Sequence, residues 1–475
     1  MTTSLNPGAR TAGPSTALMW AILGLVLLAD ALDMIDSTVT NIAAPTIADE
    51  LGAGTGLIKW LGASYALAMG ILLVVGGRLG DKFGQRRIFL IGMAGFTVAS
   101  AVCGLSPDPL LLVIARVAQG AFGALMLPQG MAIMTKTFSR DMLAKAFGLF
   151  GPLLGIASVG GPVLAGFIIN WDVAGLSWRP IFLVNVILGV IGLAVAVRLL
   201  PHDDGDRTTV IDGWGSGILA VTMFGLMFGL IEGSTNGWGV VPIASVLVGA
   251  CAAALFAYRQ RHTDDPLLQP SLFHNRGFTS GLLMGLLIFA ATSGLVYVMS
   301  LFLQMGLGVS ARGASLALMP VTIGIIVSAF ATMGGLMTRL GRTLVAIGLG
   351  AIAVGVGWLL GLVIAYGTGI SVWSMVLPFF VIGLGMGACY GTIFDIALGD
   401  INPDEAGSAS GSMSAIQQLA TGVGSATVTT VFFQLAAHNQ SRAMEVSLVI
   451  VLVAAAICVP VVRMLPRRAP EEVGH

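Results

Sequence analysis

Three aspartates, Asp30, Asp33 and Asp36, lie inside the first long apolar segment of the chain. A charged side chain at the centre of a bilayer costs about 2.5 to 3.5 kcal/mol, so acids at such positions usually serve ion pathways or proton relays. With about 100° of rotation per residue, the three carboxylates share one face of a helix. The same face carries the polar residues Ser37, Thr40 and Asn41. We interpret this stripe as the lining of a water-filled cavity, and the alternative is a set of snorkelling or packing residues.

A basic residue, Arg116, lies in the fourth long apolar segment, and Gln119 follows one helical turn later. Counting about 1.5 Å per residue from the outer ends of the segments places Arg116, Asp33 and Asp36 at similar depths, roughly 7 to 12 Å. An intramembrane charge needs a counter-charge, so we expect Arg116 to face these carboxylates. The alternative is an arginine that only locks helix packing.

The composition is that of a helical protein that crosses a membrane many times. Of the 475 residues, 56% are hydrophobic and 10% are charged, and the mean hydropathy is +0.93. The formal net charge is zero, so the total charge indicates no nucleic-acid partner. The first apolar segment is too long for the core of a signal peptide, so we expect it to be retained as a transmembrane helix.

Cysteines and histidines are few, and neither set forms a recognisable site. The four cysteines lie singly in different apolar segments, which predicts neither a metal site nor a disulfide framework. All five histidines lie in predicted loops or in the C-terminal tail. Protons that cross this membrane protein would therefore move on carboxylates.

Apolar runs long enough to cross about 30 Å of hydrocarbon predict fourteen helices. If the N-terminus is cytoplasmic, eighteen of the 23 basic residues fall on the cytoplasmic side and four on the other, with Arg116 in the membrane. This bias places both termini in the cytoplasm, and one helix more or fewer would remove it. The predicted helices are 17–41, 57–77, 87–106, 109–132, 143–170, 179–200, 212–233, 241–260, 278–303, 311–338, 343–366, 372–396, 407–435 and 443–463.

A partial internal repeat indicates two related halves. Gly77, Lys82 and Gly84 after the second helix correspond to Gly334, Arg339 and Gly341 after the tenth. Duplicated halves with a site between them are typical of transporters. We therefore divide the chain into a tail at 1–16, a six-helix bundle at 17–200, a linker with two inserted helices at 201–277, a second six-helix bundle at 278–463 and a tail at 464–475.

The run from Gly77 to Arg87, GRLGDKFGQRR, resembles the signature loop between the second and third helices of the major facilitator superfamily. Its glycines permit a tight turn, and Asp81 can accept hydrogen bonds from the positive end of a helix and from arginines. The alternative is an ordinary basic cytoplasmic loop, which would need neither the glycines nor Asp81. The candidate gating residues are Gly77, Asp81, Lys82, Gly84, Arg86 and Arg87.

Further motifs are similar to those of the fourteen-helix drug:proton antiporter branch of that superfamily. The run 36–41, DSTVTN, looks like the first-helix motif of the branch, and 116–120, RVAQG, looks like the fourth-helix motif whose arginine is linked to proton transfer. In the fifth helix, Gly161, Pro162 and Gly166 resemble the antiporter motif, although alanine stands at two positions where the pattern has glycine. A generic small-residue packing face is the alternative there. The run 178–185, WRPIFLVN, and Gln304 also match the branch.

This resemblance implies a multidrug or antibiotic exporter of the bacterial cytoplasmic membrane that is driven by the proton gradient and needs no cofactor. It implies coupling on Asp36 first, then Asp33 and Arg116, with Asp30 and Asn41 beside them. Three neighbouring carboxylates should titrate as a coupled group. The expected substrate is a small lipophilic compound, and we expect no nucleic acid and no obligatory protein partner.

The alternatives are a proton-coupled transporter of a small metabolite, such as an amino acid, peptide or siderophore, and a non-transporting receptor of the same fold. An enzyme is not expected, since the sequence lacks an HExxH motif, a phosphate-binding GxxxxGK[ST] loop and a nucleophile with a base. We interpret Glu232 and Asp395 as interfacial residues. Gln417 and its neighbour Gln418 are candidates to line the cavity.

Overall fold

The computed structural model describes residues 15–53, 55–149, 153, 175–263, 266–402 and 405–466. This part of the chain forms helices joined by short connections and contains no β-strand. Twelve of its helices are long and apolar enough to cross a membrane. The prediction of an all-helical polytopic membrane protein is confirmed.

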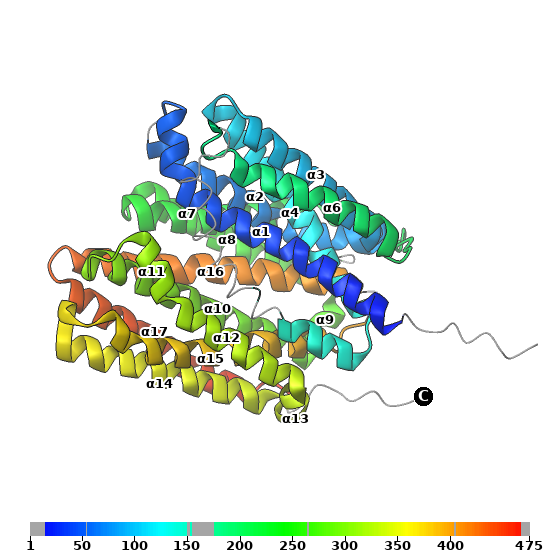
Figure 1. Ribbon diagram of the computed structural model, residues 1–475. Coiled ribbons are helices and arrows are strands. Elements are labelled where there is room, and N and C mark those ends of the chain that lie inside the picture. Colours follow the sequence, from blue (N-terminus) through cyan, green and yellow to red (C-terminus); the bar gives the residue numbers. More distant parts are fainter. Residues whose placement is uncertain are drawn as a thin grey trace, which may run out of the picture.

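The first helices of the chain pack together in the upper part of Figure 1. They are α1 (Thr16–Glu50), α2 (Thr55–Phe83), α3 (Gln85–Leu105), α4 (Pro109–Thr137) and α6 (Pro180–Leu199). α4 packs along α2 and α3, while α6 contacts α1 and α3. Glycines bring α2 and α4 unusually close, because a Cβ on Gly120 would lie 2.3 Å from the carbonyl oxygen of Tyr65.

The last part of the chain forms a second group of helices in the lower part of Figure 1. Its helices are α9 (Pro270–His274), α10 (Arg276–Leu301), α11 (Ala311–Ala317), α12 (Met319–Ala331), α13 (Met337–Leu340), α14 (Arg342–Tyr366), α15 (Val376–Leu398), α16 (Ala406–Ala436) and α17 (Gln440–Val462). Short π and 3-10 turns, η2 (Phe302–Gly306), η3 (Thr332–Leu336), η4 (Gly367–Gly369) and η5 (Val372–Met375), join some of them. α10 contacts α15, α16 and α17, and α14 packs on α15.

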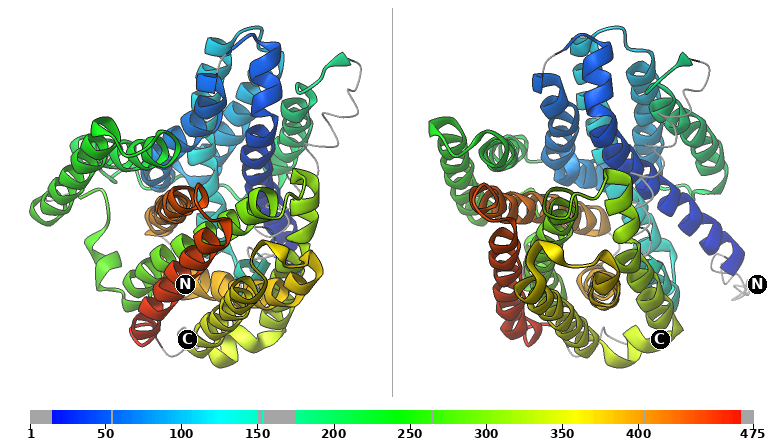
Figure 2. Two further views of the ribbon diagram at one scale, coloured as in Figure 1. Left: turned by 90° about the vertical axis from the view of Figure 1, so that its left-hand side faces the viewer. Right: turned by 60° about the vertical axis from the view of Figure 1, so that its left-hand side comes forward.

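Two further helices, α7 (Gly213–Asn236) and α8 (Val240–His262), form a hairpin on one flank of the molecule, green in Figure 2. α8 packs on α7, which contacts both α2 and α16 and so bridges the two groups of helices. The ring of Trp60 on α2 stacks on Phe228 of α7 at 6.2 Å between centroids. The indole of Trp238 donates to the hydroxyl of Thr430 on α16 at 3.1 Å.

Asp212 caps the N-terminus of α7, where the hairpin begins, and forms an ion pair with Arg259. Its carboxylate accepts from the backbone N–H of Gly215 and, at 2.8 and 3.0 Å, from the guanidinium of Arg259 on α8. The hydrogen bonds from Arg259 lower the pKa of Asp212 below its usual value. The ionised form therefore stabilises the fold at neutral pH, and this contribution is lost only as the pH falls through the depressed pKa.

The fourteen-helix count is not confirmed. Most of the predicted helix 143–170 lies outside the described residues. The predicted helix 311–338 is interrupted in the structure, which divides the segment into α11, α12 and α13. Pro320 has no N–H for the helical hydrogen-bond ladder, and Gly335 has a positive φ of 93° that interrupts the helix again.

The motif at 77–87, which we predicted to be a loop between two helices, is mostly helical. α2 continues to Phe83 and α3 begins at Gln85, so only Gly84 connects them, with a φ of 91° that favours glycine. The gating residues therefore lie on two helix ends whose positions are fixed by packing. α1 begins and α17 ends at the same end of the molecule, on the right in Figure 1, and we refer to it below as the end near the termini.

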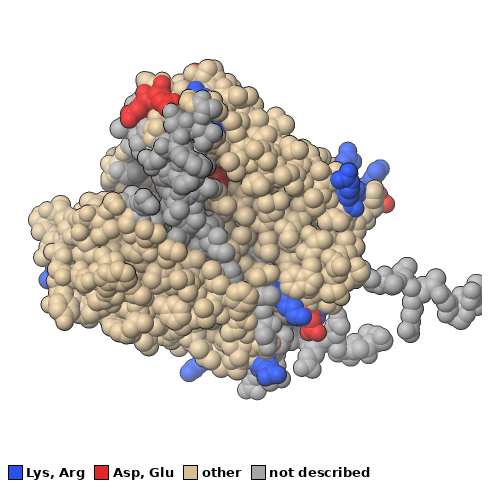
Figure 3. Space-filling model, in the orientation of Figure 1, with Lys and Arg blue, Asp and Glu red and all other residues tan. Residues whose placement is uncertain are grey.

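Charge on the visible surface lies mainly away from the middle of the molecule. In Figure 3 several Lys and Arg groups lie toward the end near the termini, and a broad flank carries no charged side chain. An uncharged flank with basic residues beyond it is the surface expected of a protein embedded in lipid.

Candidate functional site

Asp36 on α1 lies at the centre of a buried polar cluster formed by three helices. Its carboxylate is hydrogen-bonded and ion-paired to Arg116 of α4. It also accepts from the side-chain amides of Gln119 on α4, at 3.0 Å, and Asn185 on α6, at 2.5 Å. Asp36 is 1% exposed and Arg116 is fully buried. The structure thus brings the predicted acid and arginine into direct contact.

Arg116 is held by further contacts besides Asp36. Its guanidinium donates to the backbone carbonyl of Leu61 at 3.1 Å and to the side-chain oxygen of Gln119 at 2.7 Å. It also lies over the ring of Tyr65, 4.3 Å from the centroid, in a cation–π contact. The positive charge is therefore compensated and its geometry is fixed.

The other two aspartates of the stripe, Asp30 and Asp33, have no such ion pair in the described part of the chain. The hydroxyl of Tyr65 on α2 donates to the carboxylate of Asp33. One carboxylate oxygen of Asp30 is buried and has no hydrogen-bond partner. Asp30 is 8% exposed and Asp33 is 7% exposed. The acid stripe is thus packed against neighbouring helices, whereas we expected it to line a water-filled cavity.

Sequence reasoning gave no role to three residues of this cluster. Tyr65 contacts both Asp33 and Arg116. Asn185 donates to Asp36, whereas in the sequence we noted it only as part of the run 178–185. Ser100 on α3 accepts from Gln119 at 2.8 Å. Each is a polar residue inside an otherwise apolar helix, and this is the signal that would have selected them.

Asp81 lies at the interface between α2 and the N-terminus of α16. Its two carboxylate oxygens accept from the backbone N–H groups of Gly407, at 3.1 Å, and Ser408, at 3.0 Å. These N–H groups carry the positive end of the helix dipole, which favours an anion there. The backbones also approach closely, since a Cβ on Gly77 would lie 2.1 Å from the carbonyl oxygen of Gly407.

The connection between α6 and α7 contacts the end of α2 and the start of α3. The carboxylate of Asp203 accepts from the backbone N–H of Gln85 at 2.8 Å and so caps α3. The N–H of Asp206 donates to the carbonyl of Asp81 at 2.8 Å. The guanidinium of Arg86 contacts the imidazole of His202. Arg87 is exposed, and the ammonium of Lys82 lies 5.8 Å from the ring of Phe83.

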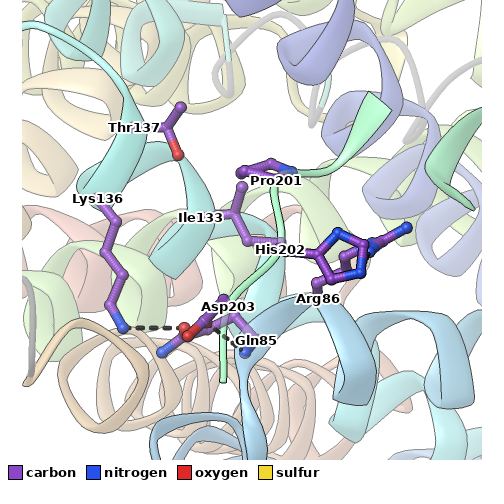
Figure 4. A pocket seen from close by; sticks show the side chains of 8 residues that line it. All are labelled: Gln85, Arg86, Ile133, Lys136, Thr137, Pro201, His202 and Asp203. Atoms are coloured by element: carbon purple, nitrogen blue, oxygen red, sulfur yellow. Dashed lines mark hydrogen bonds between the residues drawn. The ribbon is translucent and has the colours of Figure 1, made fainter. Parts of the chain in front are cut away.

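This connection closes one side of a polar surface pocket of about 390 Å³, shown in Figure 4. The pocket is lined by Gln85, Arg86, Ile133, Lys136, Thr137, Pro201, His202 and Asp203. The ammonium of Lys136 donates to the side-chain oxygen of Gln85 at 2.9 Å. The basic groups around the pocket are therefore engaged with protein acceptors.

Replacing Asp203 with Ala is expected to destabilise the protein by about 1 kcal/mol, because the N-terminus of α3 loses its cap. Thermal unfolding of the purified protein in detergent should then have a lower midpoint. Asp204→Ala at the exposed neighbouring position is the matched control and should leave the midpoint unchanged. Equal midpoints for the two variants would show that the cap contributes nothing.

Asp395, which we interpreted as an interfacial residue, lies near the end of α15 and is 4% exposed. Its carboxylate accepts from the guanidinium of Arg140 at 3.0 Å. Arg140 follows α4, so this ion pair joins the first group of helices to the second. We did not predict this ion pair from the sequence.

The remaining candidates are not brought to the acid cluster. Glu232 accepts from Asn236 on its own helix. Gln304 is exposed and donates to the hydroxyl of Ser300 at 3.0 Å. Gln417 is partly buried on α16, beside Gln418, whose amide lies 3.4 Å from the sulfur of Met69. The side chain of Asn41 and the motif residues Gly161, Pro162 and Gly166 lie outside the described residues.

Within the described residues, no group of three His, Cys, Asp or Glu side chains could hold a metal ion. The cysteines at 103, 251, 389 and 458 are unpaired there. The carboxylates of the cluster are groups that can take up a proton or attract a cation, and Arg116 is the counter-charge of Asp36.

Comparison with known proteins places this geometry in a family. A family model described as Major Facilitator Superfamily matches residues 26–425. The chain is 37% identical to a "Probable actinorhodin transporter" of Streptomyces coelicolor, over 93% of this chain and 77% of the relative. It is 31% identical to the "Cephamycin export protein CmcT" of Amycolatopsis lactamdurans, over 98% of each chain.

The fold is also that of solved transporters. The structure of the proton:xylose symporter XylE superposes with a TM-score of 0.64 at 16% sequence identity, covering 94% of this chain and 96% of that one. This likeness shows the fold alone. Together with the family match over most of the sequence, it shows that the chain belongs to the Major Facilitator Superfamily of membrane transporters.

Proposed function

We propose that the protein is a proton-coupled antiporter that exports lipophilic drugs or antibiotics across the bacterial cytoplasmic membrane. The observation that carries the proposal is the buried Asp36–Arg116 pair beside Asp33 and Asp30, two acids without an ion pair among the described residues. Intramembrane acids of this kind serve proton relays in transporters. Relatives named as an actinorhodin transporter and a cephamycin exporter support the direction of transport and the substrate class.

The energy source in this proposal is the proton gradient, and no cofactor is required. The coupling residues are Asp36, Asp33, Asp30, Arg116 and Gln119, with Asn41 as a further candidate. The substrate is small and lipophilic, and a positive charge on it would be favoured by the acids. A single chain with its lipid bilayer is sufficient for the reaction.

The architecture that we propose is the fourteen-helix one, with both termini in the cytoplasm. Residues 17–200 and 278–463 would form the two bundles, and 201–277 the linker with the inserted pair. Basic residues toward the end near the termini support this orientation. The segments 143–170 and 311–338 would supply the two helices beyond the twelve apolar ones, and Gly161, Pro162 and Gly166 would form the antiporter motif.

Alternating access in this proposal exchanges the present conformation for one that opens at the end near the termini. Among the contacts between the groups of helices that hold that end together, two are made by carboxylates: Asp81 with the N-terminus of α16, and Asp395 with Arg140. Both must break when the end opens. They act as conformational locks and take no part in proton exchange.

Replacing Asp395 with Asn is expected to shift the population toward the open conformation by about tenfold, because a hydrogen bond to a charged group contributes about 1.5–3 kcal/mol. Spin labels at the exposed positions of Arg87 and Arg339, in a cysteine-free background, report the opening as a longer distance. Asp400→Asn at a neighbouring exposed position is the control. Identical distance distributions for both variants would exclude the ion pair as a lock.

The function itself is tested in inside-out membrane vesicles with an imposed pH gradient. A fluorescent lipophilic cation should accumulate only in vesicles that contain the protein, and a protonophore should stop it. Accumulation that survives collapse of the gradient would exclude proton coupling. A lack of accumulation for a panel of lipophilic cations, anions and neutral antibiotics would exclude drug export.

A further inference from the structure

The environment of Asp36 leaves it poorly suited to exchange a proton. Its carboxylate accepts from three side chains, of Arg116, Gln119 and Asn185. Neutralising Asp36 would leave the fully buried guanidinium of Arg116 without its counter-charge, and an uncompensated buried charge is strongly destabilising.

Asp33 lies one helical turn before Asp36 in a different environment. The hydroxyl of Tyr65 donates a hydrogen bond to it, and no Lys or Arg of the described residues forms an ion pair with it. The titratable and charged groups that face it are Asp30 and Asp36 on α1, Tyr65 on α2, and Arg116 on α4. An anion at Asp33 is stabilised mainly by one hydroxyl and by an arginine already paired elsewhere.

Tyr65 connects the two environments. Its hydroxyl donates to Asp33, and the face of its ring carries the guanidinium of Arg116 at 4.3 Å. Two glycines of α4 make room for it, since a Cβ on Gly120 would meet the Tyr65 backbone at 2.3 Å and one on Gly123 would lie 3.3 Å from the hydroxyl oxygen. Protonation of Asp33 would therefore alter a hydrogen bond of Tyr65, the residue whose ring contacts Arg116.

We propose that Asp33 carries the exchanged proton, that Asp36 stays ionised and paired with Arg116 throughout, and that Tyr65 is the positioning residue that links them. This inference rests on the proposed proton-coupled function and assigns the coupling proton within it. It differs from the expectation based on family resemblance, which places that proton on Asp36.

The exchange step is a simple protonation. A proton from the accessible side forms an O–H bond on the Asp33 carboxylate. The resulting neutral acid no longer needs the hydrogen bond that the Tyr65 hydroxyl donates to the anion. In the other conformation the O–H bond breaks, the proton leaves to the opposite side, and the Tyr65 hydroxyl again donates to the carboxylate. Asp36 is essential because the buried guanidinium of Arg116 needs it as a counter-charge.

The test needs no substrate. Infrared difference spectra of the full-length protein in lipid vesicles are recorded on acidification, where a newly protonated buried carboxyl gives a C=O band. We expect Asp33→Asn to remove this band and Asp49→Asn, which changes an exposed acid on the same helix, to keep it. We expect Tyr65→Phe to keep the band but to move its midpoint about one pH unit higher, because the ionised form loses one charge-assisted hydrogen bond.

A band of full amplitude in Asp33→Asn would overturn the proposal, as would a Tyr65→Phe midpoint equal to that of wild type. Tyr65→Phe keeps the ring beneath Arg116 and removes one hydroxyl, so it carries the test even if Asp33→Asn does not fold. Loss of transport in the wild type would count against the proposed function alone, because the infrared titration is independent of transport.

Discussion

Asp36→Asn is expected to abolish proton-driven export while the protein still reaches the membrane. The substitution keeps the shape of the side chain but removes the negative charge that compensates Arg116. Breaking a buried ion pair costs about 3–5 kcal/mol, enough to change the populations of the transport conformations by orders of magnitude. The measurement is accumulation of a fluorescent substrate in inside-out vesicles, normalised to the amount of protein in the membrane.

Two companion variants separate the causes. Asp49→Asn changes an exposed acid near the end of the same helix and should transport normally. The double variant Asp36→Asn with Arg116→Gln removes both charges, so it should regain thermal stability without regaining coupled export. Normal transport by Asp36→Asn, or by the double variant, would show that the pair is not required.

Gly77→Ala is expected to reduce transport at least tenfold. A Cβ at this position would lie 2.1 Å from the carbonyl oxygen and 2.9 Å from the carbonyl carbon of Gly407, and neither backbone atom can yield without separating α2 from α16. The hydrogen bonds from Gly407 and Ser408 to Asp81 would lengthen as well. The conformation described here should therefore lose population to the open one.

The spin-label pair at Arg87 and Arg339 measures this population directly, together with transport in vesicles. Gly350→Ala is the matched control, because a Cβ on Gly350 meets no atom within 4 Å. Transport and distance distributions that are the same for Gly77→Ala and Gly350→Ala would contradict the role of this close contact.

The fold class and the centre of the site could be predicted from the sequence for a simple physical reason. Long apolar segments have few alternatives to membrane-spanning helices. A buried arginine must meet a carboxylate, and only the acids of α1 lay at the depth of Arg116. The contact between Arg116 and Asp36 follows from these two constraints.

Other features depend on tertiary packing that no local pattern encodes. The roles of Tyr65, Asn185 and Ser100 appear only when α1, α2, α3, α4 and α6 are packed together. The connection that brings Asp203 to the N-terminus of α3 has no periodic pattern of apolar residues from which its position could be predicted. The pairing of Arg140 with Asp395 joins residues 255 positions apart in the sequence.

Proton movement and substrate movement should be recorded together in proteoliposomes of the purified protein, without an imposed pH gradient. A substrate gradient should drive protons in the opposite direction in the wild type, and Asp36→Asn should move neither. Substrate movement in the wild type with no accompanying proton flux, or with protons travelling in the same direction, would contradict proton-coupled export.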